Sequence, residues 1–164
     1  MNRWRGLALV TAMAVVSTAG TSPGRAATAT ASLAVQVEVL AGCEISGATL
    51  DFGNYQSGQT TDLVSNTTLA LRNCTVDTVV VELDGGQTGD TRARRLAGPG
   101  GATLSYQLYK GPSLGNMFGD NGAGRTIDMT NRTSLNVPVH GRIRGGQSVP
   151  PGTYTDTINV TLTF

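Results

Sequence analysis

The chain has 164 residues, with 22 glycines, one histidine and 14% charged side chains. Residues 1–27 hold three of the 12 basic side chains and none of the 11 acidic ones, so the remainder has 12 − 3 = 9 basic and 11 acidic residues, a net charge of 9 − 11 = −2. Nucleic-acid-binding domains normally carry a basic surplus, and this composition argues against that class. Few charges, many glycines and abundant threonine and valine instead predict an all-β chain with many turns.

The N-terminus has the three regions of a secretory signal peptide. Arg3 and Arg5 precede an apolar run over residues 7–16, and small and polar residues follow as far as Ala27. This run is shorter than the roughly 20 apolar residues that span a membrane, which favours a cleaved signal over an anchor. We predict a signal peptide over residues 1–27 and an exported chain of 164 − 27 = 137 residues that forms one domain.

An alternating segment follows the predicted signal. Leu33, Val35, Val37 and Val39 occupy every second position, which is the period of a half-buried strand. Residues 33–45 are predicted to form one long strand or two strands hinged at residues 41–42. The segment is either the first strand of its own domain or a strand given to another subunit. We favour donation for Leu33 and Val35, and leave both interpretations open for Val37 and Val39.

Short alternating segments separated by turn signals predict the other strands. They lie at residues 50–55, 67–74, 78–83, 103–110, 136–143 and 153–164. The glycine-rich stretches 85–101 and 111–125 are predicted to be loops. Because no segment has a helical period of useful length, the pattern favours a β-sandwich.

The last predicted strand places Ile158, Val160, Leu162 and Phe164 on one face and threonines and an asparagine on the other. The sequence ends on this strand, so we expect an uncovered sheet edge here and a spare strand near the N-terminus. Unpaired strand edges are costly, and an added strand satisfies them. Subunits that complete one another in this way, by donor-strand complementation, would form a polymer.

Cys43 and Cys74 are the two cysteines of the chain. In an exported protein they predict a disulfide, which would close a loop of about 30 residues and stabilise the fold by roughly 3–4 kcal/mol. A metal-binding or catalytic thiol is the disfavoured alternative, because no cluster of other ligands accompanies either cysteine.

The sequence contains no convincing active site. His140 lies inside a predicted strand, facing away from Val139, and a single histidine cannot supply both a base and a metal site. Asp84 and Asp90 flank a glycine-rich loop that could be considered as a calcium site. Calcium needs about six oxygen ligands, and this loop offers only two carboxylates, so a plain turn is favoured. We therefore predict no enzyme activity, no metal and no cofactor.

Three arginines lie close together in the first predicted loop, at positions 92, 94 and 95. They form either a patch that binds an acidic surface or a solvated loop with incidental ion pairs. The second interpretation is favoured.

Several segments together resemble a known family, and their order and spacing are more specific than any one of them. They are AGCEI at 41–45, LDFG at 50–53, NCT at 73–75, LSYQLY at 104–109, VHGRI at 139–143 and PGTYTDT at 151–157. Over about residues 35–164 the chain resembles the spore coat protein U domain, the subunit domain of archaic chaperone–usher pili. Leu96 and Phe118 stand where that family often has methionine and tryptophan, and both changes keep an apolar side chain.

The resemblance implies an incomplete immunoglobulin-like β-sandwich over residues 41–164, completed by a donor strand from residues 28–40 of a neighbouring subunit. It also implies a Cys43–Cys74 disulfide, and a periplasmic chaperone that lends a strand until an outer-membrane usher exchanges it. The hypothesis is a structural pilus subunit for attachment and biofilm formation, exported to the periplasm and then to a cell-surface fibre. Its membrane contact would be through the usher alone. A secreted spore-coat or carbohydrate-binding β-sandwich is the alternative.

Overall fold

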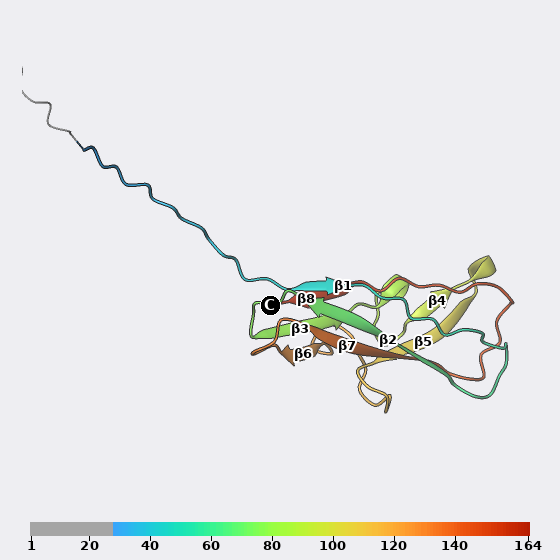
Figure 1. The fold of residues 1–164 in the computed structure, drawn as a ribbon. Coiled ribbons are helices and arrows are strands. Elements are labelled where there is room, and N and C mark those ends of the chain that lie inside the picture. Colours follow the sequence, from blue (N-terminus) through green and yellow to red (C-terminus); the bar gives the residue numbers. More distant parts are fainter. Residues whose placement is uncertain (1–27) are drawn as a thin grey trace, which may run out of the picture. The chain divides into compact units, whose positions relative to one another are not determined.

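A computed structural model describes residues 28–164 (Figure 1). The predicted signal peptide lies outside the described residues. The chain divides into two compact units, one ending at Val37 and the other comprising Glu38–Phe164. The described residues of the first unit, 28–37, form no helix or strand. Within the described part of the chain, no helix is long and apolar enough to cross a membrane.

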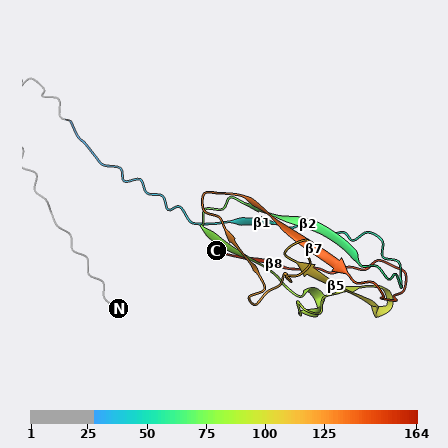
Figure 2. The same cartoon turned by 90° about the horizontal axis from the view of Figure 1, so that it is seen from below.

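The second unit is built from two antiparallel sheets (Figures 1 and 2). The larger sheet has the order β1 (Glu44–Ser46), β2 (Leu63–Arg72), β7 (Leu135–Ile143), β5 (Thr103–Tyr109) and β4 (Arg95–Ala97). The smaller sheet has the order β6 (Arg125–Asp128), β3 (Thr78–Leu83) and β8 (Val160–Thr163). The described residues contain only two short 3-10 helices, η1 (Gly86–Thr88) and η2 (Pro99–Gly101), so the all-β prediction is confirmed.

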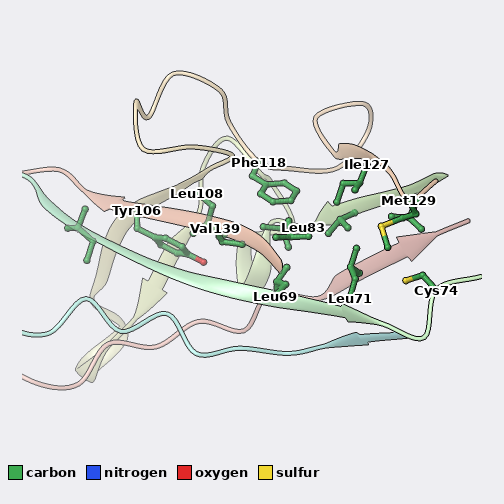
Figure 3. Close-up of a cluster of buried hydrophobic side chains, with 14 of the residues drawn as sticks. Leu69, Leu71, Cys74, Leu83, Tyr106, Leu108, Phe118, Ile127, Met129 and Val139 are labelled. Carbon is green, nitrogen blue, oxygen red and sulfur yellow. The ribbon is translucent and has the colours of Figure 1, made fainter. Parts of the chain in front are cut away.

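Alternate side chains of both sheets fill the space between them (Figure 3). Each such buried aliphatic side chain stabilises the fold by about 1.5–3 kcal/mol relative to exposure. The predicted strand faces are confirmed, because the inward positions are those that alternation selected. They are Leu69 and Leu71 of β2, Val79, Val81 and Leu83 of β3, Leu104, Tyr106 and Leu108 of β5, and Val137, Val139 and Ile143 of β7.

Strand boundaries differ from the prediction near the N-terminus. Of the predicted strand 33–45 only Glu44 and Ile45 belong to a strand, β1, and residues 50–55 form no ladder at all. Leu50 and Phe52 are nevertheless half-buried and pack against the core. Alternation therefore identified the inward side chains correctly, but it does not reveal whether a neighbouring strand is present to pair with the backbone.

Two short strands were missed and one was predicted too long. Strand β4 has three residues and lies in the predicted loop 85–101, and β6 has four residues, of which the first ends the predicted loop 111–125 and the others had no predicted element. The predicted strand 153–164 forms a ladder only in β8, with an isolated bridge between Thr155 and Ala97 upstream of it. Segments this short carry too few alternating positions to be distinguished from loops.

Candidate functional site

A hydrophobic groove opens between the two sheets. Its cavity has a volume of about 330 Å³ and lies between residues 47–52 on one side and residues 156–160 on the other. Core side chains from both sheets contribute to its lining, among them Leu69, Leu83 and Leu108. A second cavity of about 680 Å³ adjoins it and shares Leu50 and Phe52 with it. We call these two cavities together the groove.

The C-terminal side of the groove is an unpaired strand edge. Strand β8 pairs with β3 and is the outermost strand of its sheet. The backbone N–H of Asp84 donates to the Asn159 carbonyl oxygen at 3.1 Å, so Asp84 and Asn159 form a hydrogen-bonded pair next to this ladder. Since hydrogen-bonding direction alternates along a strand, the backbone N–H and C=O groups of Val160 and Leu162 point away from β3. Both side chains are half-buried and pack against the core, and that of Val160 lines the 330 Å³ cavity.

The opposite side of the groove also lacks a ladder. Among residues 28–164, the backbone groups of Ala48, Thr49 and Leu50 make no hydrogen bond. The Asp51 carbonyl oxygen accepts a hydrogen bond from the Ser65 hydroxyl at 2.5 Å, which ties the segment to β2 by a side chain alone. Both sides of the groove therefore present backbone groups that an inserted extended chain would satisfy.

A glycine in β7 allows residues 50–52 to lie against the larger sheet. Gly141 is buried and faces the interior, and a Cβ atom there would meet the side chain of Leu50 at 2.5 Å and that of Phe52 at 2.6 Å. This side of the groove was not among the predicted site residues. The sequence feature that could have indicated it is the alternation of Leu50 and Phe52 in a segment that has no neighbouring strand to form a hairpin with.

The predicted groove residues fall into two groups. Ile158, Val160 and Leu162 are half-buried and pack against the core, and Ile158 and Val160 line the 330 Å³ cavity. Phe164 differs: it lies one residue beyond β8 and its side chain is 58% exposed. The ladder with β3 ends at Thr163, so no strand holds Phe164 in the register of the other three.

The predicted donor residues are highly exposed. Leu33, Val35, Val37 and Val39 have side chains that are at least 82% exposed, and no strand is assigned to them. A contiguous stripe of exposed large aliphatic side chains is unusual in a soluble protein and indicates an interaction site.

The Cys43–Cys74 disulfide joins the residue before β1 to the turn after β2. Backbone and hydroxyl hydrogen bonds between Gly42 and Thr75 reinforce the same connection. The start of the sandwich is thus fixed a few residues after the exposed stripe. A structural disulfide is typical of oxidising compartments and indicates a location outside the cytoplasm.

A carboxylate and a phenol flank the groove. The Tyr106 hydroxyl donates to Asp156 Oδ2 at 2.7 Å, and Asp156 Oδ1 accepts from the backbone N–H of Gln87 at 2.9 Å. Burial, followed by the hydrogen bond to Asp156, raises the pKa of Tyr106 far above its ordinary value, so the phenol stays protonated. This hydrogen-bonded pair holds the chain before β8 in place. It is not the combination of base and nucleophile that a catalytic site requires.

Other residues considered in the sequence are structural. His140 is half-buried on the outer face of β7, between β2 and β5, and so lies in a central strand. Within residues 28–164, no three His, Cys, Asp or Glu side chains form a group suited to a metal ion. Arg94 is buried, with 1% exposure, whereas Arg92 and Arg95 are exposed, so the expectation that all three arginines of this loop lie on the surface was wrong for Arg94.

Asp84 fixes the C-terminal segment to the end of β3. Its carboxylate accepts hydrogen bonds from the backbone N–H of Gly86 at 2.9 Å, from the backbone N–H of Asn159 at 3.0 Å and from the Asn159 side chain at 2.6 Å. Partial burial raises the pKa of Asp84, but these hydrogen bonds and the nearby Arg94 outweigh it and bring the pKa below the ordinary 3.8.

The lowered pKa of Asp84 predicts an acid-sensitive stability. The stabilisation is complete above the unfolded-state pKa of 3.8 and is lost as the pH falls through the lower folded-state pKa. Melting temperatures measured between about pH 6 and about pH 2 should fall less steeply in Asp84→Asn than in the parent. Asp77→Asn is the control, because Asp77 is exposed and its side chain makes no hydrogen bond among the described residues. Parallel curves for the parent and Asp84→Asn would contradict this assignment.

Comparison with known sequences decides the family. Residues 29–161 match the family described as the Spore Coat Protein U domain, which is most of the chain. The chain belongs to this family. It is also 33% identical over 177 aligned positions to Protein U of Myxococcus xanthus, with 96% of this chain and 99% of Protein U covered. The resemblance noted in the sequence is thereby confirmed.

Solved structures confirm the pilin-like fold. A chain in the CsuC–CsuE chaperone–tip adhesion subunit pre-assembly complex, from archaic chaperone–usher Csu pili of Acinetobacter baumannii, matches 77% of this spore coat protein U domain protein. The match has a TM-score of 0.56 and 22% identity, and the present chain spans only 40% of that chain. The P pilus rod subunit PapA matches over 74% of this chain and 97% of its own, with a TM-score of 0.53 and 19% identity. These matches are to coat and pilus proteins rather than to enzymes.

Proposed function

We propose that this protein is a structural subunit of a surface pilus that polymerises by donor-strand complementation. The observation that carries the proposal is the groove, which combines half-buried apolar side chains with unpaired backbone on both sides. An extended segment with apolar side chains at alternate positions fits such a groove, because its backbone extends the ladder while its side chains fill the cavity. Residues 28–40 of another copy supply such a segment in Leu33, Val35, Val37 and Val39.

The geometry favours an open chain of subunits. The proposed donor lies near the N-terminus and the groove lies in the sandwich, so each contact joins two different surfaces. Heterologous contacts of this kind build filaments unless they close into a ring. The proposal includes identical or homologous subunits, a periplasmic chaperone and an outer-membrane usher as partners, a cell-surface fibre as the location, and attachment and biofilm formation as the role. Likeness to chains from pilus complexes supports it.

A coat assembly is the second candidate. The family description and the similarity to Protein U of Myxococcus xanthus favour it. Strand exchange through the same groove would build either assembly. Electron microscopy of the producing cells distinguishes the two, because a pilus appears as thin fibres at the surface and a coat as a continuous layer.

A matched pair of double substitutions tests the donor segment. Leu33→Asp with Val35→Asp should reduce polymer yield by at least about tenfold, because burying an unpaired carboxylate costs several kcal/mol. Ala34→Asp with Gln36→Asp adds the same charge on the opposite side of the extended segment. Polymers are measured by size-exclusion chromatography and by electron microscopy.

The control pair should polymerise as the parent does. Equal polymer yields from the two pairs would show that alternation in residues 28–40 has no role, and the donor assignment would then be wrong.

A further inference from the structure

A second hollow, separate from the groove, is lined by arginines. It has a volume of about 610 Å³, and Arg92, Arg94, Arg95, Arg142 and Arg144 all contribute to it, with no acidic residue in its lining. These are five of the nine basic residues between positions 28 and 164. We call it the arginine hollow. A concave site lined by one sign of charge concentrates the electrostatic field and attracts ions of the opposite sign.

The hollow lies on the outer face of the larger sheet. On β5 the side chains of Leu104 and Tyr106 are buried in the core, so the alternate residue Ser105 faces outward. Arg95 of β4 is paired with Ser105, and Arg142 of β7 is paired with Gln107. The lining residues of the hollow and those of the groove have only Tyr106 in common. A strand bound in the groove would therefore leave the arginines accessible.

Two of the five arginines are held in place by hydrogen bonds to neutral groups, and Arg142 Nε also lies 3.8 Å from Asp62 Oδ2 in a partly exposed ion pair. Arg94 forms the buried base of the hollow and donates hydrogen bonds to the carbonyl oxygens of Leu83, Asp84 and Phe118 and to Gln107 Oε1, at 2.6–2.9 Å. Arg142 Nη2 donates to the Tyr109 hydroxyl at 2.6 Å, and its guanidinium lies 5.2 Å from the centre of the Tyr109 ring. This packing holds Arg142 against the sheet.

The other three guanidinium groups have no partner within residues 28–164. The side chains of Arg92, Arg95 and Arg144 are exposed and make no hydrogen bond or ion pair there. The incidental ion pairs expected from the sequence are thus absent from this part of the chain for Arg92 and Arg95. Like charges gathered around one hollow repel each other, and a bound anion would relieve that repulsion.

We propose that the arginine hollow binds the carboxylate or sulfate groups of an acidic polysaccharide. A guanidinium presents two parallel N–H donors that match a planar or tetrahedral oxyanion. The outward Ser105 hydroxyl makes no hydrogen bond within the described chain and is placed to meet a sugar hydroxyl. The volume lies within the range of small-molecule sites, which suits one or two sugar rings.

Two other anionic partners fit less well. Nucleic acid is normally bound along an extended basic stripe that follows the phosphate backbone, whereas these arginines converge on one hollow. An acidic peptide bound as an added strand needs a free sheet edge. β5 and β7 are paired on both sides, and the outer edge of the three-residue strand β4 is already bridged to Thr155 at Ala97. The proposal does not depend on strand exchange, so it stands or falls separately from the pilus assignment.

The test compares two triple variants of the mature protein. Arg92→Gln, Arg95→Gln and Arg144→Gln remove the three unpartnered charges, and Arg72→Gln, Arg125→Gln and Arg132→Gln remove three basic side chains outside the hollow. The probes are heparin for sulfate, polygalacturonate for carboxylate, neutral dextran and duplex DNA. Melting temperatures establish that both variants are folded.

The hollow variant should bind heparin or polygalacturonate at least about tenfold more weakly than the parent, because three charge-assisted contacts are lost. The control variant should lose less than about twofold. Preference for one of the two acidic polysaccharides identifies sulfate or carboxylate as the bound group. Equal losses in the two variants, binding of neither polysaccharide, or equally tight hollow-dependent binding of DNA would each overturn the proposal.

Discussion

A second copy of residues 28–40, fused behind Phe164 through a flexible linker, is expected to convert the protein into a stable monomer. The fused segment can return alongside β8 as a hairpin partner, where the backbone groups of Val160 and Leu162 point away from β3. Its apolar side chains would then cover the half-buried Ile158 and the rest of the groove.

The expected size of this effect follows from burial. Four aliphatic side chains that are at least 82% exposed in the chain alone would enter an apolar cavity, each contributing about 1.5–3 kcal/mol before the cost of ordering the segment. A net gain of about 3 kcal/mol raises the melting temperature of a domain of this size by roughly 10 °C or more. The measurement is the melting temperature together with the oligomeric state from light scattering.

The matched control is the same fusion with aspartate in place of Leu33 and Val35 in the added copy. It keeps the length, the linker and most of the composition, but it places charges where the groove is apolar. We expect this control to melt as the parent does and to remain able to polymerise. If parent and fusion are both monomeric and melt alike, the sandwich is already complete and the groove does not accept a strand.

The sequence was sufficient to predict the centre of the fold. In β3 and β5 every inward position is apolar, and the structure buries Val79, Val81, Leu104 and Leu108 as a period of two requires. Such segments pair on both edges with neighbours in the same chain. Their sequence pattern and their tertiary surroundings agree, so local reasoning is enough.

The groove could be predicted only in part, because alternation reports which face is apolar and not what covers it. Ile158 and Leu50 have the same pattern as core residues, yet each lies in a segment without a ladder. Gly141 is the feature that lets Leu50 approach β7, and a single glycine in a strand has several possible explanations.

The arginine hollow was beyond local reasoning for a different reason. Arg92 and Arg95 are close in sequence, but Arg142 and Arg144 come from a strand end about 50 residues later. Only the pairing of β5 with β4 on one side and β7 on the other brings these groups around one site. Arg94 looked like a member of the same patch, although burial and carbonyl acceptors give it a structural role.

Removing the disulfide by Cys43→Ala with Cys74→Ala is expected to lower the free energy of unfolding by about 3–4 kcal/mol and the melting temperature by roughly 10 °C or more. The bond closes a loop with a sequence separation of 31 between the start of β1 and the end of β2, so its loss frees the unfolded chain more than it disturbs the core. The hydrogen bonds between Gly42 and Thr75 and the ladder between β1 and β2 remain to hold the start of the sandwich. Urea denaturation of the double variant and of the parent treated with a reductant should give matching midpoints. A parent whose midpoint is unchanged by reduction would show that the disulfide contributes nothing to stability.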